Sequence, residues 1–151
     1  GVHLPDDAQV FWEPESLVGN WLVLGRASYF SYSHLAGQMF NRGTFADGRA
    51  REARMLPLMQ EGTRCRERTA QGDDTCHISK ASLRRACLPG KTPTPDFLVL
   101  PYAQPQQATG EWRVPSVGRL GQQATFRIFS CEQLLREVGS SGARCTIANV
   151  F

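Results

Sequence analysis

The sequence predicts an all-β fold, an eight- to nine-stranded antiparallel up-and-down β-barrel with one short helix near the C-terminus. Three observations favour it. Most apolar segments are short and have strand-like spacing, turn residues separate them, and one helix is well signalled. Closing a meander of short strands into a barrel removes the strand edges that an open sheet exposes. A β-sandwich is the alternative, because the number of strands alone does not distinguish the two.

The first half of the chain supplies the predicted strands that precede the proline-rich loop. Residues 20–27 are apolar around Trp21 and are expected to form a well-buried strand. The Asp47-Gly48 pair is a good hairpin turn signal between two further segments. The predicted strands of this half are residues 20–27, 37–45, 49–59, 63–69 and 75–79.

The second half alternates between strands and loops. Three prolines forbid helix and central strand over residues 88–95, and a second polar loop follows at residues 104–110. Between and after these loops, apolar segments predict strands at residues 97–103, 110–117, 123–130 and 144–151.

One helix is predicted to follow residue 130. Ser130 and Gln133 fit a capping box, with Ser130 as the N-cap and Gln133 at the third helical position. Leu134, Leu135 and Val138 form an apolar stripe, and Gly139 is a natural stop. Residues 79–88 are a second, shorter helix candidate.

Length and composition exclude several classes of protein. The 151 residues suit one domain, residues 1–151, and the 41% apolar and 21% charged content is that of a globular chain. No apolar run is long enough to span a bilayer, so no transmembrane segment is expected. The net charge of +3 is too weak to indicate a nucleic-acid partner.

The five cysteines predict disulfides and hence a secreted or extracellular protein. They are Cys65, Cys76, Cys87, Cys131 and Cys145. Their spacing lacks the close pairs of a zinc site and the Cys-x-x-Cys of a thioredoxin motif, so we expect no metal. Two disulfides would leave one thiol unpaired or joined to a partner. Cys65 and Cys76 lie symmetrically about a turn and can bridge it, and Cys131 would be an activated thiol if it is the free one.

A motif near the N-terminus resembles the opening motif of the lipocalin family. Gly19-Asn20-Trp21, preceded by Leu17 and Val18, matches the Gly-x-Trp that begins the first strand of those proteins, and the likeness covers residues 14–28. The family's second motif, Thr-Asp-Tyr, has no match here; the nearest stretch is residues 101–103.

The resemblance implies a carrier that holds a small hydrophobic ligand inside the barrel. It assigns Gly19 and Trp21 to closing the narrow end, with Arg127 stacked on Trp21 by a shifted register. It also implies that Cys65 or Cys87 is joined to Cys145. The ligand class is a lipid, fatty acid, retinoid or pigment, and no cofactor is expected.

Strand alternation suggests which side chains face the ligand. Among them Tyr102 is the most informative, because a buried hydroxyl needs a partner that a ligand can supply. The inward-facing candidates are Phe40, Met55, Leu98, Leu100, Tyr102, Trp112, Val114, Phe126 and Ile128.

Two other functions stay open at this point. Arg64, Arg66 and Arg68 share one face of a predicted strand, so the chain can be a module that binds a protein or polyanion. A small isomerase using one reactive cysteine is the second alternative. No established catalytic motif occurs, and His34 sits in an aromatic loop segment, residues 29–34, where a solvated histidine is the ordinary interpretation.

Overall fold

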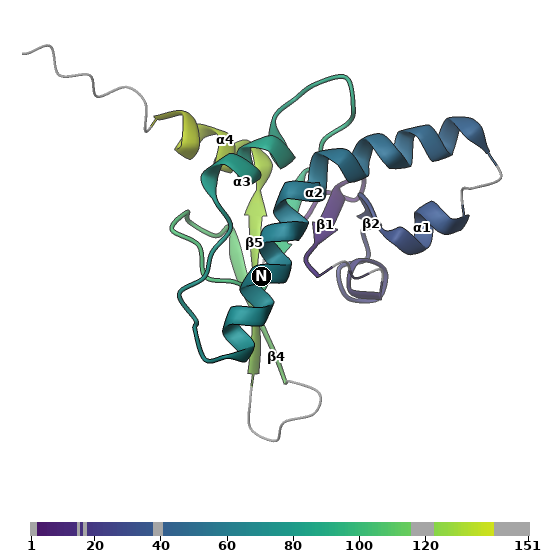
Figure 1. Cartoon of the computed structure of the whole chain (residues 1–151). Coiled ribbons are helices and arrows are strands. Elements are labelled where there is room, and N and C mark those ends of the chain that lie inside the picture. The colour runs from purple at the N-terminus through teal and green to yellow at the C-terminus, as the bar shows by residue number, and fades with distance from the viewer. Residues whose placement is uncertain (1–2, 15, 17, 38–40, 116–122, 141–151) are drawn as a thin grey trace, which may run out of the picture.

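A mixed, open sheet forms the centre of the molecule in the computed structural model (Figure 1). The structure describes residues 3–14, 16, 18–37, 41–115 and 123–140. Within them, five strands have the order β2 (Ala27–Ser28), β1 (Gln9–Trp12), β3 (Phe97–Leu100), β5 (Gln123–Ser130), β4 (Gly110–Pro115). β1 is parallel to β2 and to β3, whereas β5 is antiparallel to β3 and β4. The carboxyl ends of β1 and β3 therefore lie at the same end of the sheet, which we call its carboxyl edge.

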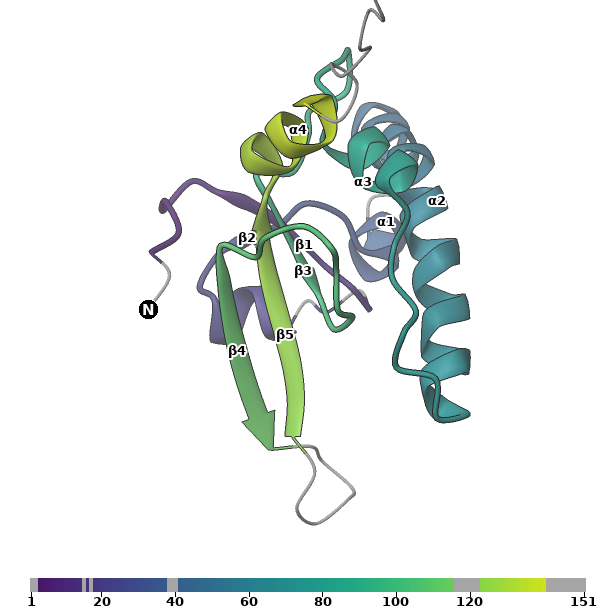
Figure 2. The same cartoon turned by 90° about the vertical axis from the view of Figure 1, so that its left-hand side faces the viewer.

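Helices pack on one face of this sheet and at one of its ends (Figure 2). The longest is α2, Arg42–Ala70, followed by α3, Lys80–Cys87, and by α4, Cys131–Ser140, which continues from β5. The short elements η1, Gly19–Val23, and α1, Tyr32–Gly37, connect β1, β2 and α2. The architecture is that of a helical layer on a sheet, with α3 packed between α2 and α4.

The two faces of the sheet bury different clusters, as the two-residue period of a strand requires. On the helical side, Phe11, Leu98, Leu100 and Phe129 pack with side chains of the three long helices. On the other side, the buried residues are Leu4, Val10, Trp12, Val99 and Ile128, with Trp112 and Phe126 packed against them.

The predicted all-β barrel is wrong. The sheet is open, with β2 and β4 at its edges among the described residues, and one long helix replaces most of the strands predicted before residue 79. Within the predicted strand at residues 20–27, residues 20–23 lie in the π-helical turn η1 and only Ala27 belongs to a strand, β2. Residues 75–79 are not a strand. The last predicted strand, residues 144–151, lies outside the described residues.

Helix α2 has a pattern that the turn and proline signals obscured. Its buried Met55, Leu58, Gly62 and Cys65 recur at intervals of three and four residues, the spacing of one helix face. Asn41 caps its start by accepting hydrogen bonds from the backbone N–H groups of residues 43 and 44, at 3.0 and 3.3 Å. The Asp47-Gly48 pair therefore lies in the second turn of a helix rather than in a hairpin.

The described elements of the second half of the chain form where they were predicted. Strands β3, β4 and β5 form within the predicted segments, and α3 follows an N-cap at Ser79. Helix α4 begins where the capping box places it, with the Ser130 hydroxyl accepting from the Gln133 backbone N–H at 3.5 Å. The loops at residues 88–95 and 104–109 contain neither helix nor strand.

Two disulfides connect parts of the helical layer, one between α2 and the loop after it and one between α3 and α4. Cys65 of α2 is bonded to Cys76, the bridge about a turn that the spacing allowed. Cys87 is bonded to Cys131, so Cys131 is not a free thiol. The pairing of Cys65 or Cys87 with Cys145 is wrong, because both have other partners; Cys145 itself lies outside the described residues.

Candidate functional site

The strongest candidate site lies where β1 and β3 end. In open sheets with parallel strands, ligands bind beyond the carboxyl ends of the strands, where the chain leaves the sheet. Here Glu13 and Pro14 follow β1, while Pro101 and Tyr102 follow β3. Because the two strands are adjacent and parallel, these four residues meet at one edge, against the last turns of α2.

A buried carboxylate anchors this edge. Glu13 is only 3% exposed and forms an ion pair with Arg66 of α2. The Tyr102 hydroxyl donates to the carbonyl of Gly62 at 2.8 Å and lies 3.4 Å from Glu13 Oε1. Burial raises the pKa of Tyr102, and the neighbouring Arg66 charge partly offsets that rise. The network fixes α2 against the carboxyl ends of the strands.

Gly62 is required for this close approach. A Cβ atom at residue 62 would lie 2.5 Å from Glu13 Oε1 and 2.7 Å from Glu13 Cδ, closer than atoms can pack. The glycine therefore lets the helix backbone lie directly against the buried carboxylate, and the Gly62 carbonyl satisfies the Tyr102 hydroxyl.

Beside this network lies a cavity of about 550 Å³, which we call the carboxyl-edge cavity. Its wall comes from the ends of β1 and β3, the end of α2, the loop after it and the beginning of β5. The residues that line it are Pro14, Arg66, Thr69, Asp74, Cys76, Pro101, Tyr102, Ala103, Thr125, Phe126 and Arg127. Its volume is in the range of small-molecule sites.

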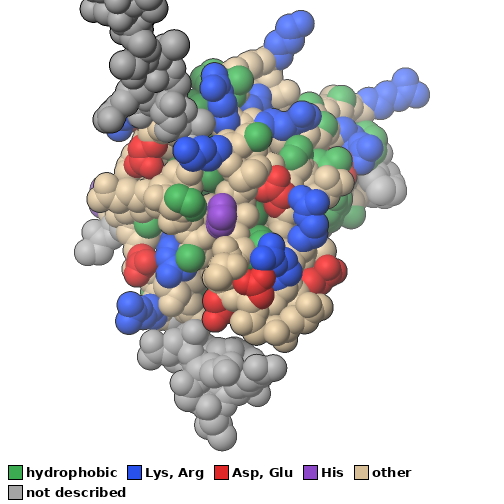
Figure 3. Space-filling model, turned by 60° about the vertical axis from the view of Figure 1, so that its left-hand side comes forward, with side chains coloured by type: hydrophobic (Ala, Val, Ile, Leu, Met, Phe, Trp, Pro, Cys, Tyr) green, Lys and Arg blue, Asp and Glu red, His purple; other side chains and the backbone are tan. Residues whose placement is uncertain are grey.

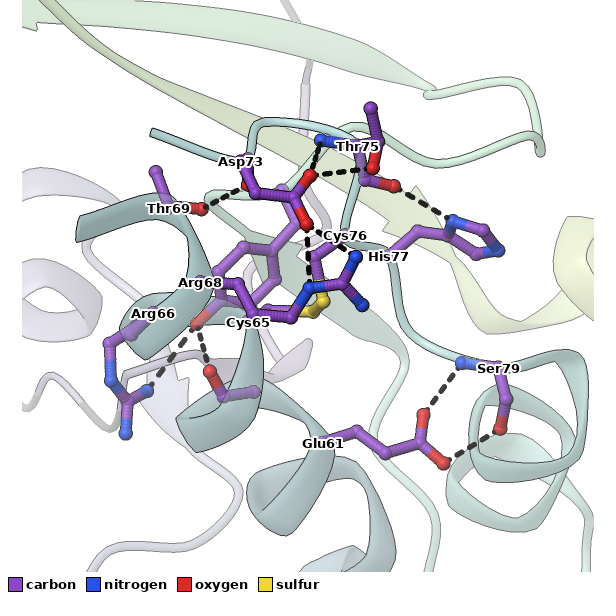
Figure 4. Close-up of a disulfide and its surroundings, with 12 residues drawn as sticks. Glu61, Cys65, Arg66, Arg68, Thr69, Asp73, Thr75, Cys76, His77 and Ser79 are labelled. Carbon is purple, nitrogen blue, oxygen red and sulfur yellow. Dashed lines mark hydrogen bonds and ion pairs between the residues drawn. A yellow bond between two sulfur atoms is a disulfide. The ribbon is translucent and has the colours of Figure 1, made fainter. Parts of the chain in front are cut away.

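The Cys65–Cys76 disulfide and an aspartate turn hold the loop side of the cavity (Figure 4). Asp73 accepts hydrogen bonds from the Thr75 hydroxyl at 2.6 Å and the Thr75 backbone N–H at 3.0 Å, and one from Arg68 Nε at 2.7 Å. These bonds lower the pKa of Asp73 to about 2, the Thr75 hydroxyl contributing most. The loop is thus fixed by local bonds before any ligand contacts it.

The β5 side of the cavity presents the cation of Arg127, whereas the ring of the adjacent Phe126 points to the opposite face of the sheet. Phe126 stacks edge-on against Trp12, with ring centroids 5.0 Å apart, and Trp112 lies 6.2 Å from Phe126. Arg127 donates through Nε to Glu111 at 2.9 Å across the β4–β5 pair. The remaining guanidinium N–H groups of Arg127 have no other partner among the described residues.

The predicted ligand-facing residues divide between this cavity and the core. Tyr102 and Phe126 line the cavity, and Trp112 packs on the same aromatic cluster. Met55, Leu98, Leu100 and Ile128 are buried in the two hydrophobic clusters, where they pack against other side chains. Phe40 and the side chain of Val114 lie outside the described residues.

The barrel-closing assignment of Gly19, Trp21 and Arg127 is wrong, because the sheet is open. Trp21 is 51% exposed on η1, and its ring lies 5.1 Å from that of His34. Arg127 is bonded to Glu111 on the edge of the sheet instead of stacking on Trp21. Gly19 is buried against the Trp12 ring, where a Cβ atom would come within 2.7 Å.

The predicted arginine face is also wrong. Arg64, Arg66 and Arg68 lie on helix α2, where steps of two residues turn side chains away from one another. Arg66 pairs with Glu13 and Arg68 with Asp73. Two of the three charges are therefore neutralised within the fold.

Among the described residues, few side chains are placed to act as the nucleophile of an enzyme. The four described cysteines are all in disulfides, which limits the reactive-cysteine hypothesis to Cys145. Ser31, His34 and Asp47 line one cavity of about 260 Å³, but the Ser31 hydroxyl accepts from the His34 backbone N–H at 3.1 Å, as a cap of α1. No group of three or more His, Cys, Asp or Glu side chains in the described ranges could hold a metal ion.

Sequence reasoning missed Glu13 and the role of Arg66. An acidic residue directly after an apolar run, before a proline, is the only local signal for Glu13, and it does not distinguish a buried carboxylate from a turn residue. The partnership with Arg66 spans 53 residues and follows only once α2 is known to be a helix.

Comparison with protein-family models, with curated proteins and with solved structures found no match. The resemblance of residues 14–28 to lipocalins thus remains a prediction, while the barrel that it implied is replaced by the open sheet. Among the helices that the structure describes, none is both long and apolar enough to cross a membrane.

Proposed function

We propose that the chain is a secreted binding protein that holds a small, largely apolar ligand with a carboxylate headgroup in the carboxyl-edge cavity. The observation that carries the proposal is the mixed wall of this 550 Å³ cavity, in which apolar side chains and a guanidinium face the same space. Apolar walls with a few placed polar groups are the usual form of a small-molecule site.

The two ends of such a ligand have separate partners in the cavity. Its apolar part lies against Pro14, Pro101 and Ala103, where burial of each CH₂ group contributes roughly 0.8 kcal/mol. Its carboxylate accepts hydrogen bonds from the N–H groups of Arg127 that Glu111 does not use. Arg66 remains ion-paired with Glu13 and forms part of the cavity wall.

The secreted location rests on the disulfides. Two described disulfides are typical of proteins that fold in an oxidising compartment, and the described helices include no membrane span. The Cys65–Cys76 disulfide has a second role, because together with the Asp73 turn it holds one wall of the carboxyl-edge cavity in place before a ligand binds.

The test is calorimetric titration with dodecanoate, compared between two arginine variants. Arg127 and Arg136 are both paired with a glutamate, but only Arg127 lines the cavity. We expect Arg127→Gln to weaken dodecanoate binding roughly ten-fold, in line with loss of a charged hydrogen bond, and Arg136→Gln to leave it unchanged.

A third variant tests the cavity itself. Ala103 is exposed and lines the cavity, so Ala103→Phe fills part of its volume without disturbing the core. We expect this variant to abolish dodecanoate binding while keeping the far-ultraviolet circular dichroism of the native chain. Dodecanoate that binds Ala103→Phe and the native chain equally, or that does not bind the native chain, would refute the proposed function.

A further inference from the structure

A second candidate site lies between α2 and α3. Next to it, a carboxylate of α2 holds the start of α3 by hydrogen bonds. Glu61 of α2 accepts hydrogen bonds from the Ser79 backbone N–H at 2.6 Å, the Ser79 hydroxyl at 2.8 Å and the Ser82 hydroxyl at 2.7 Å. Burial raises the pKa of Glu61, but these bonds together outweigh it and lower the pKa below the ordinary value. The start of α3 is therefore fixed on α2.

Beyond this contact, the two helices and the loop after α3 line an open depression of about 610 Å³, which we call the arginine groove. Its cations are Arg54 of α2 and Arg84 and Arg85 of α3. The other residues that line it are small or apolar: Ala50, Ala53, Ala81, Leu88, Pro89 and Thr92. None of the described residues that line the groove is acidic.

The charges of the groove are held in place by neutral partners. Arg54 donates to the carbonyls of Arg85, at 3.2 Å, and of Thr92, at 2.9 Å, and also to the carbonyl of Leu88. Arg85 donates to the Ala53 carbonyl at 3.2 Å. Carbonyl oxygens satisfy some of the N–H donors but do not cancel the positive charge.

One side chain of the groove remains available for a ligand. The Nε atom of Arg54 is buried, so it does not reach a ligand on the surface. Arg84 is exposed, and its guanidinium forms no hydrogen bond or ion pair with any described residue. On the face drawn in Figure 3, Lys and Arg side chains predominate in the upper half, whereas both signs alternate in the lower half.

We propose that the arginine groove binds a sulfated glycan chain. Its guanidinium groups match the anionic oxygens of sulfate and carboxylate groups, and its apolar lining suits the C–H faces of sugar rings. An extended polyanion fits this groove better than a small ligand, since the groove is open and Arg84 and Arg85 are exposed at its surface. The described disulfides indicate an oxidising compartment, and extracellular polyanions are mainly sulfated glycans.

The experiment is titration of the full chain with a heparin-derived octasaccharide at several salt concentrations. Arg84→Gln removes one groove charge without breaking a bond of the fold, and Arg113→Gln removes the same charge from exposed β4. We expect Arg84→Gln to weaken octasaccharide binding at least five-fold and to reduce its salt dependence, while Arg113→Gln changes it less than two-fold. Ala81→Glu, which places a carboxylate in the groove, should abolish binding.

The outcomes separate this proposal from the proposed function. Dodecanoate binding should be unchanged in Arg84→Gln and Ala81→Glu, because neither residue lines the carboxyl-edge cavity. Equal loss of octasaccharide affinity in Arg84→Gln and Arg113→Gln would show only non-specific charge attraction and would overturn the assigned groove. Equal competition by a single-stranded DNA oligonucleotide of matched charge would overturn the glycan as the partner.

Discussion

The carboxyl-edge cavity and the arginine groove both take arginines from helix α2, but these arginines have different partners. In the cavity, Arg66 is paired with the buried Glu13. In the groove, Arg54 donates to backbone carbonyls, and Arg84 of α3 has no partner among the described residues. Arg54 and Arg66 are about 18 Å apart along the helix axis, at 1.5 Å per residue.

The difference shows what decides the role of an arginine. A carboxylate partner neutralises the charge and makes the pair a cross-link within the fold, as Glu13 and Arg66 cross-link the sheet to α2. A carbonyl partner fixes the side chain but leaves the charge to attract an anion. The number of arginines in a segment is therefore a poor indicator of polyanion binding. A better indicator is whether carboxylates or carbonyls accept the hydrogen bonds of these arginines.

Replacing one arginine in each region gives the largest contrast. Arg66→Ala leaves the carboxylate of Glu13 buried without its cation, and we expect it to cost about 2–3 kcal/mol, since water reaches the half-exposed Arg66 position. Arg84→Ala removes an exposed side chain that has no partner among the described residues, and it should cost less than about 0.5 kcal/mol. Urea unfolding followed by circular dichroism measures both, and equal costs would mean that the Glu13–Arg66 pair does not stabilise the fold.

A pair of glycines on α2 tests how closely the helix must approach Glu13. Gly62→Ala drives a Cβ atom to 2.5 Å from the carboxylate and should destabilise the protein by about 1–3 kcal/mol. Gly43→Ala, in the first turn, meets no atom closer than 3.5 Å and should be neutral or stabilising by up to about 1 kcal/mol. Thermal unfolding of the two variants gives the comparison, and a stable Gly62→Ala protein would contradict the close packing of α2 at this edge.

The smallest effect is expected at the turn that closes the cavity end of α2. The pKa of Asp73 is lowered from 3.8 to about 2, so its ionised form stabilises the native state at pH values above about 4. This contribution should decrease as pH falls from 4 to 2, where the carboxylate takes up a proton. The unfolding midpoints of the native chain and of Asp73→Asn should therefore converge over that range, and a difference that is constant with pH would exclude the lowered pKa.

The part of the fold that sequence predicts well is the part with local signals. The three strands after residue 96 are short apolar segments bounded by prolines and glycines, and α4 has a capping box at Ser130. Ser79 marks the start of α3 in the same way. In each case the residues that decide the structure are neighbours in the chain.

Helix α2 was missed because its local signals favour other structures. Gly43, Gly48, Pro57 and Gly62 all lower helix propensity or end helices, and all lie inside α2. Tertiary packing of Met55, Leu58 and Cys65 against the sheet overrides them, and this packing follows only from contacts distant in sequence. The lipocalin-like residues 19–21 show the same effect, since Asn20 is the buried side chain there and Trp21 is exposed.

The candidate sites were predictable only in part. Strand patterning selected Tyr102 and Phe126, which line the carboxyl-edge cavity. The arginine face predicted from Arg64, Arg66 and Arg68 did not include the arginines that line the groove. Which arginines keep an uncompensated charge depends on the positions of Glu13 and Asp73, and these follow from the three-dimensional arrangement.

Arginine modification by phenylglyoxal, read residue by residue by mass spectrometry with and without the heparin-derived octasaccharide, tests the central distinction most directly. We predict that Arg84 reacts fast and is protected by the octasaccharide, because it is exposed and unpaired with any described residue. We predict that Arg66 reacts slowly in both conditions, because Glu13 holds its guanidinium. Equal reactivity of Arg66 and Arg84, with no protection of Arg84, would contradict the distinction between the two regions.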